Sequence, residues 1–338
     1  MMADDMVISS RVRLARNYED LPFDLSGSAG DADACIARTV NALALSGCRE
    51  EYALVRLADL TENQRQSLVD SHRISRDLLR TADTAAVLLN DRDELSIMMN
   101  EEDHLRIQAV RPGRELLSAA MACFRVDDAL SRQVRFAYDK QLGYLTSCPT
   151  NTGTGMRASL MIHLPMLTLF KQMGSVGQIV AKVGLTIRGV YGEGSEALGN
   201  IYMVSNQVTL GRTEQEIINT VNAVGHQLCD MENALREKAM RDGQVQTEDT
   251  VYRAWGLMKH ARLMHMNEFF KLWSSVRMGA SMGLLPVTTT ALDSLLDEAQ
   301  DANLCARAES GLNGNALAER RARLIRQTLS GDDRNGGM

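Results

Sequence analysis

The chain has few aromatic side chains and lacks long apolar runs. Phe, Trp and Tyr make up 4% of its 338 residues, whereas methionine occurs 19 times. Methionine is flexible and fills irregular space, so we expect it to take over core packing that aromatic residues provide elsewhere. The longest apolar stretch, near residues 160–170, is interrupted by His163 and Pro165 and is too short to cross a bilayer. The acidic N-terminal residues lack the apolar segment of a signal peptide, so we predict a cytoplasmic protein with no membrane partner.

The sequence also lacks a basic charge excess and a metal-binding or disulfide pattern. The net charge is −6, which disfavours a general nucleic-acid binder. Six cysteines are scattered without a C-x-x-C pair, which indicates free thiols in a reducing compartment. His260 and His265 do not form an i, i+4 ligand pair, and no Walker A ending is present. We therefore predict no metal held by the protein alone.

Three consecutive acids, Glu101, Glu102 and Asp103, follow an apolar run at residues 95–99. Past them the chain alternates, with apolar residues on one side and Arg106 on the other, which predicts a strand. Acids at the end of a strand suit a cation, and the arginine suits an anion. Taken alone, these residues fit a solvated charged turn equally well.

Residues 7–14 alternate in the same way and place Arg11 and Arg13 on one strand face. Two arginines without acids repel each other unless an anion lies between them, and arginine grips phosphate through two parallel hydrogen bonds. The alternative is a pair of exposed charges on an edge strand.

Two glycine-rich segments carry further charged residues. Gly153 and Gly155 allow the backbone to come close to a ligand, and Arg157 is predicted to open a helix, where anions are favoured. A second loop places three glycines around Glu193, which suggests that it moves or approaches a ligand closely. Gly-Thr-Gly alone is a weak signal that usually marks only a turn.

The remaining pattern predicts strands and helices in the first two thirds of the chain and only helices after that. We expect helices at residues 31–45, 114–126 and between 157 and 173, a strand at 51–60, and a hairpin over 85–99. Capping boxes at residues 61–64 and 213–216 each begin a helix. The second of these helices is expected to stop near Asp242 and Gly243, where we place a domain boundary. Beyond it we expect helices at 250–272, 291–305 and 316–329.

Five arginines in such settings, together with two acids, favour phosphoryl transfer to a guanidinium. The arginines are Arg11, Arg13, Arg106, Arg157 and Arg188. Phosphoryl transfer depends mainly on positioning and on neutralising phosphate charge, so it uses several arginines and Mg²⁺. A guanidinium matches a carboxylate through paired N–H donors, and it must lose a proton before it attacks phosphorus. Glu102 and Glu193 could orient it and take that proton.

Three segments resemble the signature motifs of the phosphagen (guanidino) kinases. They are residues 9–13 (SSRVR), 100–106 (NEEDHLR) and 148–157 (CPTNTGTGMR). The resemblance covers residues 6–236, and residues 157–165 and 191–201 are most similar to the bacterial protein-arginine kinase branch. It implies an α+β fold, an antiparallel sheet flanked by helices of the glutamine-synthetase-like kind, at residues 6–236. An all-α domain at 237–330 and a disordered tail at 331–338 complete the expected organisation.

The resemblance also implies roles for individual residues. Glu102 is implied to be the base that binds the target guanidinium, Glu193 its partner carboxylate, and Cys148 a thiolate beside it. The implied ATP contacts are Ser9, Ser10, Arg11, Val12, Arg13, His72, Arg106, Arg157, Ala158, Ser159, Leu160, Met161, Arg188, Gly189, Val190, Tyr191, Gly192 and Glu193. Mg²⁺ is expected to be held through ATP rather than by protein ligands.

We therefore predict an ATP-dependent kinase of arginine side chains in proteins. Small-molecule phosphagen kinases resemble one another in a helical domain before the Ser-Ser-Arg segment, whereas here eight residues precede Ser9 and helices follow the catalytic part. Without that preceding domain, one wall of the active-site cleft would be missing, which would leave room for an arginine on a polypeptide. The resemblance further implies a homodimer, an activator protein, a Clp-type protease partner and a role in stress response.

Two other functions stay open, and one motif departs from the family. The chain could phosphorylate free arginine or another small guanidino compound, or it could be a non-catalytic adaptor that binds phosphoarginine or a repressor. The Arg-Asp-x-x-Arg-Ala motif of protein-arginine kinases, which senses phosphoarginine, resembles residues 317–322. Leu317 and Ala318 replace its first two residues, and only Arg321 and Ala322 remain, so we expect this site to be degenerate.

Overall fold

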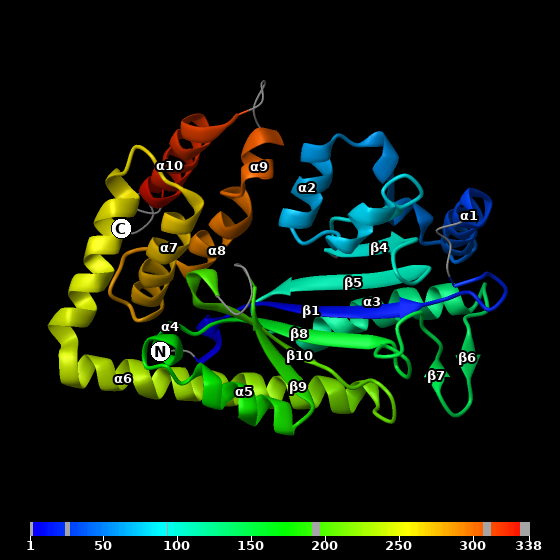
Figure 1. The fold of residues 1–338 in the computed structure, drawn as a ribbon, viewed down its shortest axis with the longest axis horizontal. Helices are drawn as coiled ribbons and strands as arrows, with labels where there is room; N and C mark the ends of the chain where they lie inside the picture. The colour runs from blue at the N-terminus through cyan, green and yellow to red at the C-terminus, as the bar shows by residue number, and fades with distance from the viewer. Residues whose placement is uncertain (1–2, 24–27, 93, 191–196, 307–311, 332–338) are drawn as a thin grey trace.

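An eight-stranded antiparallel sheet forms the centre of the computed structural model, which describes residues 3–23, 28–92, 94–190, 197–306 and 312–331 (Figure 1). The strand order is β2-β3-β4-β5-β1-β8-β10-β9, with β5, β1 and β8 in the middle. The strands are β1 (Val7–Arg16), β2 (Ala53–Arg56), β3 (Ala86–Asn90), β4 (Leu95–Met99), β5 (Leu105–Pro112), β8 (Met156–His163), β9 (Leu185–Gly189) and β10 (Ile201–Asn206). A separate small hairpin pairs β6 (Tyr138–Asp139) with β7 (Gly143–Tyr144).

Helices cover one face of this sheet. In β1, Val12 and Leu14 are fully buried and share a core with α3 (Leu116–Ser131) and with the first part of α6 (Glu214–His260). Figure 1 shows α3 behind the sheet and α6 running along its lower edge. Because side chains alternate along a strand, Arg11 and Arg13 must lie on the opposite face. The predicted alternation of β1 and β5 and the antiparallel sheet flanked by helices are confirmed.

The other helices of the first part lie around the edges of the sheet. They are α1 (Ala29–Leu45), α2 (Glu62–Asp70), α4 (Pro165–Leu169) and α5 (Met173–Lys182). Single 3₁₀ turns complete it at η1 (Ala3–Met6), η2 (Arg49–Glu51), η3 (Leu57–Asp59), η4 (Asp77–Thr81) and η5 (Leu198–Asn200). Both predicted capping boxes are present, at the start of α2 and at the start of α6.

The last part of the chain is helical, as predicted. It comprises the end of α6, α7 (Met266–Ser281), α8 (Thr289–Glu298), α9 (Asp301–Ala306) and α10 (Gly314–Gly331). These helices bury Phe269, Trp273 and Ile325 in a core that also includes Met161 of β8. The helical part is therefore packed directly against the sheet. Among the described residues, no helix combines the length and the apolar character that a bilayer span requires.

Several predicted boundaries are wrong. The helix expected between residues 157 and 173 is confined to α4, and residues 157–163 instead belong to the central strand β8, which pairs with β1 and β10. The helix α6 does not stop at Gly243: the backbone there is non-helical, with φ −157° and ψ 51°, but the helix resumes and continues to His260. The strand expected over 51–60 is four residues long, and α3 runs through Asp127 to Ser131. The division at residues 236 and 237 stays a prediction.

Candidate active site

The open face of the sheet carries a row of arginines. Arg13 of β1 is paired in register with Arg157 of β8, and Arg11 is paired with Ser159. Arg106 extends from the same face of the neighbouring strand β5. The three central strands thus bring together residues that lie about 150 positions apart in the sequence.

These cations stand close enough to disfavour one another's charge. Burial, followed by the charges of Arg106 and Arg157, lowers the pKa of Arg11 to about 10. Burial and the neighbouring arginines also lower the pKa of Arg13, and burial and then Arg188 lower that of Arg157. The Nε atom of Arg11 is buried and has no hydrogen-bond partner in the described part of the chain. Because like charges at this density repel, the cluster suits a ligand with several negative charges.

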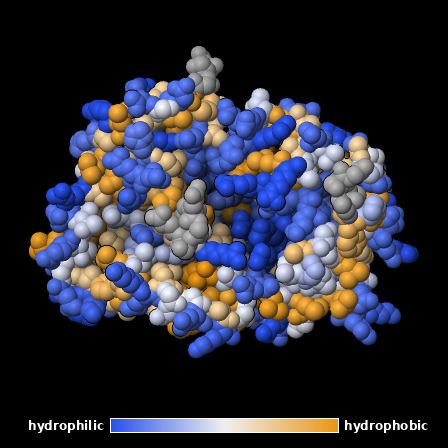
Figure 2. Space-filling view, in the orientation of Figure 1, coloured by the Kyte–Doolittle hydropathy of each residue, from blue (hydrophilic) through white to orange (hydrophobic). Residues whose placement is uncertain are grey.

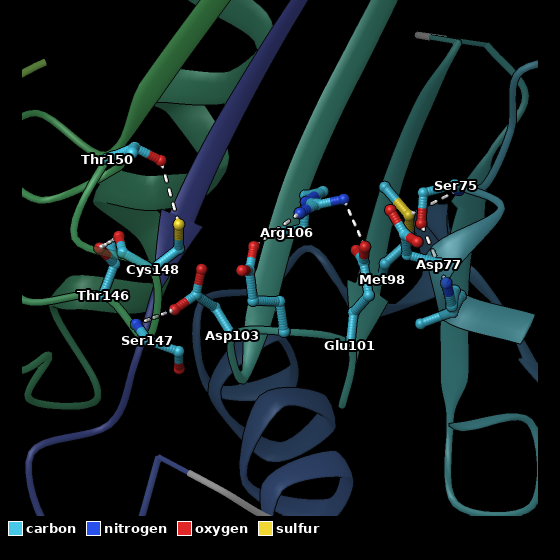
Figure 3. A network of polar contacts seen from close by, with 12 residues as sticks. Ser75, Asp77, Met98, Glu101, Asp103, Arg106, Thr146, Ser147, Cys148 and Thr150 are labelled. Atoms are coloured by element: carbon cyan, nitrogen blue, oxygen red, sulfur yellow. Dashed lines mark hydrogen bonds and ion pairs between the residues drawn. The ribbon is translucent and has the colours of Figure 1, made fainter. Parts of the chain in front are cut away.

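The three acids in the loop that joins β4 to β5 differ in their exposure and in their partners. The Glu101 side chain is 2% exposed and binds Arg106 with an N–O distance of 2.5 Å, so it fixes that arginine (Figure 3). Burial raises the pKa of Glu101, an effect that Arg106 opposes. The Glu102 side chain is 44% exposed, and its Oε2 lies 3.7 Å from Nη2 of Arg106. Glu102 is thus the acid of the three that is accessible and adjacent to the arginines.

Asp103 connects the acid loop to the segment that carries Cys148. It is buried and accepts a hydrogen bond from Nδ2 of Asn17 at 2.7 Å. It also accepts one from the backbone N–H of Ser147 at 2.8 Å (Figure 3). Asn17 in turn accepts a bond from the His104 backbone at 2.7 Å. These contacts hold the end of β1, the acid loop and the Cys148 segment in one arrangement. Sequence reasoning did not single out Asn17 or Asp103 for this role.

Cys148 lies beside the same cluster. Its Sγ is 3.0 Å from the hydroxyl of Thr150, and the residue is partly buried. Cys148 and Glu102 both raise the pKa of Arg157, so the thiol and the carboxylate face the same arginine. The cavity next to them has a volume of about 470 Å³ and is lined by Phe23, Thr81 and Glu102, among others. It can hold a cationic group within reach of the Glu102 carboxylate.

The glycines of residues 148–157 lie in close contact with neighbouring backbone. Gly153 and Gly155 have φ values of +121° and +64°. A Cβ on Gly155 would lie 2.6 Å from the backbone oxygen of Ala15, and one on Gly153 would lie 2.6 Å from that of Thr209. These contacts explain the two glycines without a ligand, and close approach of a ligand to this backbone stays a prediction. Arg157 does not open a helix, since it lies within β8.

Apart from His72, the predicted nucleotide contacts fall into four groups. The side chains of Ser9, Arg11, Arg13, Arg106, Arg157, Ser159 and Met161 lie on the open face. Those of Ser10, Val12, Ala158 and Leu160 are buried on the helix-covered side, where Ser10 donates a hydrogen bond to the Gly113 carbonyl at 2.8 Å. Arg188 and Gly189 lie at the end of β9, followed by Val190. Tyr191, Gly192 and Glu193 lie outside the described residues.

His72 also reaches this face. Burial, and then the charge of Arg11, lower its pKa to about 4, which places the ring close to the arginine cluster. Its backbone has φ +56°, and its carbonyl accepts a hydrogen bond from Nε2 of Gln108 at 2.8 Å. Gln108 therefore holds the loop after α2 in place, a role that the sequence did not reveal.

Arg321, the remaining arginine of the degenerate motif, is engaged inside the helical part. Its guanidinium donates hydrogen bonds to the carbonyls of Ala299 at 2.8 Å and Met264 at 2.9 Å, and it pairs with Asp301. Ala322 is also buried. A phosphoarginine site at these two residues stays a prediction, and a ligand would have to compete with these internal contacts.

The described side chains offer no site that could hold a metal ion without a bound ligand. Within the described ranges, no group of three or more His, Cys, Asp or Glu side chains could hold one. The arginines fit phosphate oxygens, and a Mg²⁺ ion would be held by those oxygens and by water rather than by protein ligands.

Comparisons with known proteins match both parts of the chain. Residues 35–235 match the family model of the ATP:guanido phosphotransferase C-terminal catalytic domain, and residues 244–336 match that of the protein-arginine kinase McsB C-terminal domain. Similar proteins include the protein-arginine kinases of Caldanaerobacter subterraneus subsp. tengcongensis and Bacillus subtilis. The first is 43% identical over 89% of this chain and 90% of its own length, and the second is 39% identical over 96% and 90%.

Solved structures of guanidino kinases are similar as well. Lombricine kinase matches with a TM-score of 0.60 and 26% identity, over 70% of this chain and 69% of that one. The duplicated taurocyamine kinase from Schistosoma mansoni, solved with transition-state-analogue components, matches with a TM-score of 0.63 and 26% identity. That match covers 75% of this chain and 38% of the other.

Proposed function

Because the chain belongs to the ATP:guanido phosphotransferase family, we propose that it transfers the γ-phosphoryl group of ATP to arginine side chains of proteins. The observation that carries this proposal is the position of Glu102. It is the accessible acid of its loop, and it borders both the arginine row and a cavity large enough for a guanidinium. The relatives named protein-arginine kinases, similar over nearly the whole chain, support a protein acceptor.

The chemistry follows from the two kinds of charge. The arginines of the open face hold the triphosphate and neutralise charge that spreads over the phosphoryl oxygens in the transition state. Glu102 accepts a proton from the guanidinium, whose nitrogen then forms a bond to phosphorus while the bond from phosphorus to the ADP oxygen breaks. Glu193 is proposed as the second carboxylate, and Cys148 as a thiolate beside the guanidinium. Mg²⁺, bound through the phosphates, would offset further negative charge.

Further properties are proposed on the resemblance alone. They are a cytoplasmic location, a homodimer formed through the C-terminal helices, an activator protein and a Clp-type protease partner. Light scattering tests the homodimer, because a measured mass near that of one chain would contradict it.

Substitution of the base tests the proposed reaction. Glu102→Gln keeps the shape of the side chain but cannot take a proton, so we expect transfer to fall by about 10²–10⁴-fold. Affinity for ADP should change little, because the arginines are intact. The measurement is acid-labile phosphate on an arginine-rich protein incubated with Mg·ATP, and the control is Glu50→Gln, an exposed acid of η2 far along the chain. Normal transfer by Glu102→Gln would refute the assignment.

The same assay with free arginine separates the alternatives. Transfer to free arginine but not to the protein would favour a small-molecule kinase. Transfer to neither would favour an adaptor that binds phosphoarginine or a repressor.

A further inference from the structure

A second cavity continues the arginine row toward the helical part. Its volume is about 480 Å³, and it lies between the open face of the sheet and helix α8. The sheet contributes Ser9, Gln108 and Met161, the loop after α2 contributes His72, and α8 contributes Ser294 and Asp297. Figure 2 shows a hollow lined by hydrophilic residues at the centre of this face of the molecule.

The strand register places this cavity in line with the arginines. Ser9 is paired with Met161, Arg11 with Ser159, and Arg13 with Arg157, all on the same face. At about 3.4 Å per residue, the four positions from Arg13 to Ser9 span roughly 14 Å. Along that path the surface changes from the arginines to the hydroxyl of Ser9 and the thioether of Met161. Gln108, opposite Arg13 in register, lines the cavity from β5. An extended molecule with an anionic end and an uncharged end fits this gradient, as a nucleoside triphosphate does.

We propose that helix α8 forms the outer wall of the nucleoside pocket and that Asp297 accepts a hydrogen bond from the bound nucleoside. The inference rests on the proposed function, since it takes the nucleotide as the ligand of the arginine row. The family's own sequence motifs lie on the sheet and its loops. A contribution from α8 would make the nucleotide a ligand of both parts of the chain.

Asp297 is a carboxylate that lacks a donor. Among the residues that the structure describes, it has neither a side-chain hydrogen bond nor an ion pair, and the charges nearest to it are those of Asp70 and Glu298. Burial and these two acids raise its pKa to about 7. A nucleoside offers ribose hydroxyls and an exocyclic amine as donors, and carboxylates bind ribose hydroxyls in other nucleotide sites.

Helix α8 is held rigidly enough to serve as a wall. The buried Arg277 of α7 binds Asp293 through two hydrogen bonds of 2.6 and 2.9 Å. The indole N–H of Trp273 donates to the carbonyl of Leu292 at 2.7 Å. The hydroxyl of Ser67 in α2 bonds to Asn303 of α9, so the helix that precedes the His72 loop is also tied to the helical part. Both sides of the pocket are therefore anchored before any ligand binds.

Calorimetric titration of the full chain with ADP tests the proposal without an acceptor protein. We expect Asp297→Ala to weaken ADP binding about tenfold and Asp297→Asn, which keeps one acceptor oxygen, to weaken it less. Inorganic triphosphate, which lacks a nucleoside, should bind the wild type and both variants equally. The matched control is Glu319→Gln, an exposed acid of α10 that does not line the cavity.

Modified nucleotides separate a direct contact from a merely structural role. We compare ADP with 2′,3′-dideoxy-ADP and with an analogue that lacks the exocyclic amine. The wild type should discriminate against at least one analogue, and Asp297→Ala should lose that discrimination. Discrimination that Asp297→Ala retains in full, or ADP affinity that the substitution leaves unchanged, would overturn the proposal. Normal ADP binding without transfer to protein would instead count against the proposed function.

Discussion

Two sets of arginines in this molecule differ in their partners. Arg16 at the end of β1 is buried and binds Asp127 of α3 through bonds of 2.9 and 2.8 Å, and Arg277 binds Asp293 in the same way. Arg11 and Arg13, a few positions earlier in β1, have no ion pair among the described residues. One strand therefore carries both an arginine that closes a salt bridge and two that do not.

The paired arginines contribute to stability, whereas the unpaired arginines are the ones to which we assign a function. A buried cation with a carboxylate partner has its charge compensated within the fold, and removing the partner is strongly destabilising. Cations that lower one another's pKa weaken the fold unless a ligand compensates them. The unpaired set thus weakens the fold, which is consistent with the anion-binding role that we propose for it.

The largest expected effect is the loss of a paired partner. Asp127→Ala leaves Arg16 buried without its carboxylate, so we expect the free energy of unfolding to fall by about 3–5 kcal/mol. Urea denaturation measures this, with Asp128→Ala, the exposed neighbour on the same helix, as control. If Asp127→Ala and Asp128→Ala unfold at the same urea concentration, the salt bridge does not hold the fold as we describe.

Removal of an unpaired arginine should weaken ligand binding but should not lower the stability of the fold. Arg13→Met keeps the bulk of the side chain but removes a phosphate clamp, so ADP binding should weaken by about 1.5–3 kcal/mol, or roughly tenfold or more. Stability without ligand should stay the same or rise, because repulsion from Arg11 and Arg157 is relieved. Calorimetry and urea denaturation give the two values. A variant that binds ADP normally, or that loses stability as Asp127→Ala does, would erase the distinction between the two sets.

The smallest expected effect is a pH dependence of the free energy of unfolding that arises from His72. Its pKa in the folded state is about 4, below the value of about 6.5 in an unfolded chain, because of burial and then the charge of Arg11. The unfolded chain then binds more protons between these values, so the stabilisation is complete above pH 6.5 and is lost as the pH falls toward 4. A pKa shift of this size corresponds to about 3 kcal/mol, and we expect about 1 kcal/mol because solvent reaches part of the His72 side chain.

His72→Gln should flatten this part of the stability profile, and Arg11→Met should flatten it partly. Thermal unfolding at pH 4.5, 5.5 and 7 provides the comparison. An unchanged profile in His72→Gln would show that other groups are responsible for any loss of stability in this range.

Sequence reasoning found the residues that carry charge more readily than the contacts that position them. The alternation around Arg11 and Arg106 predicted both strands, because one of their faces is apolar and the other polar. It failed for Arg157, because β8 is covered on both sides: Leu160 packs against the sheet's helices and Met161 against the helical part. A strand buried on both faces shows no clear period of two.

The contacts of Asp103 could not have been predicted either. Its partners, Asn17 and Ser147, lie 86 and 44 positions away. Gly243 gave a genuine signal of a helix end, but the helix resumes past it, since one non-helical residue can be accommodated where both halves are packed. Local sequence identifies such residues, and tertiary packing decides what they do.

The pairing of β1 with β8 has a consequence for how this protein can change over generations. Both arginines of β1 on the open face occupy odd positions, and every core side chain between Ser10 and Leu14 occupies an even one. A one-residue insertion or deletion within that segment would exchange the two sets, burying the cations and exposing the core. Point substitutions here can therefore be sampled one at a time, whereas length variation must be confined to the loops.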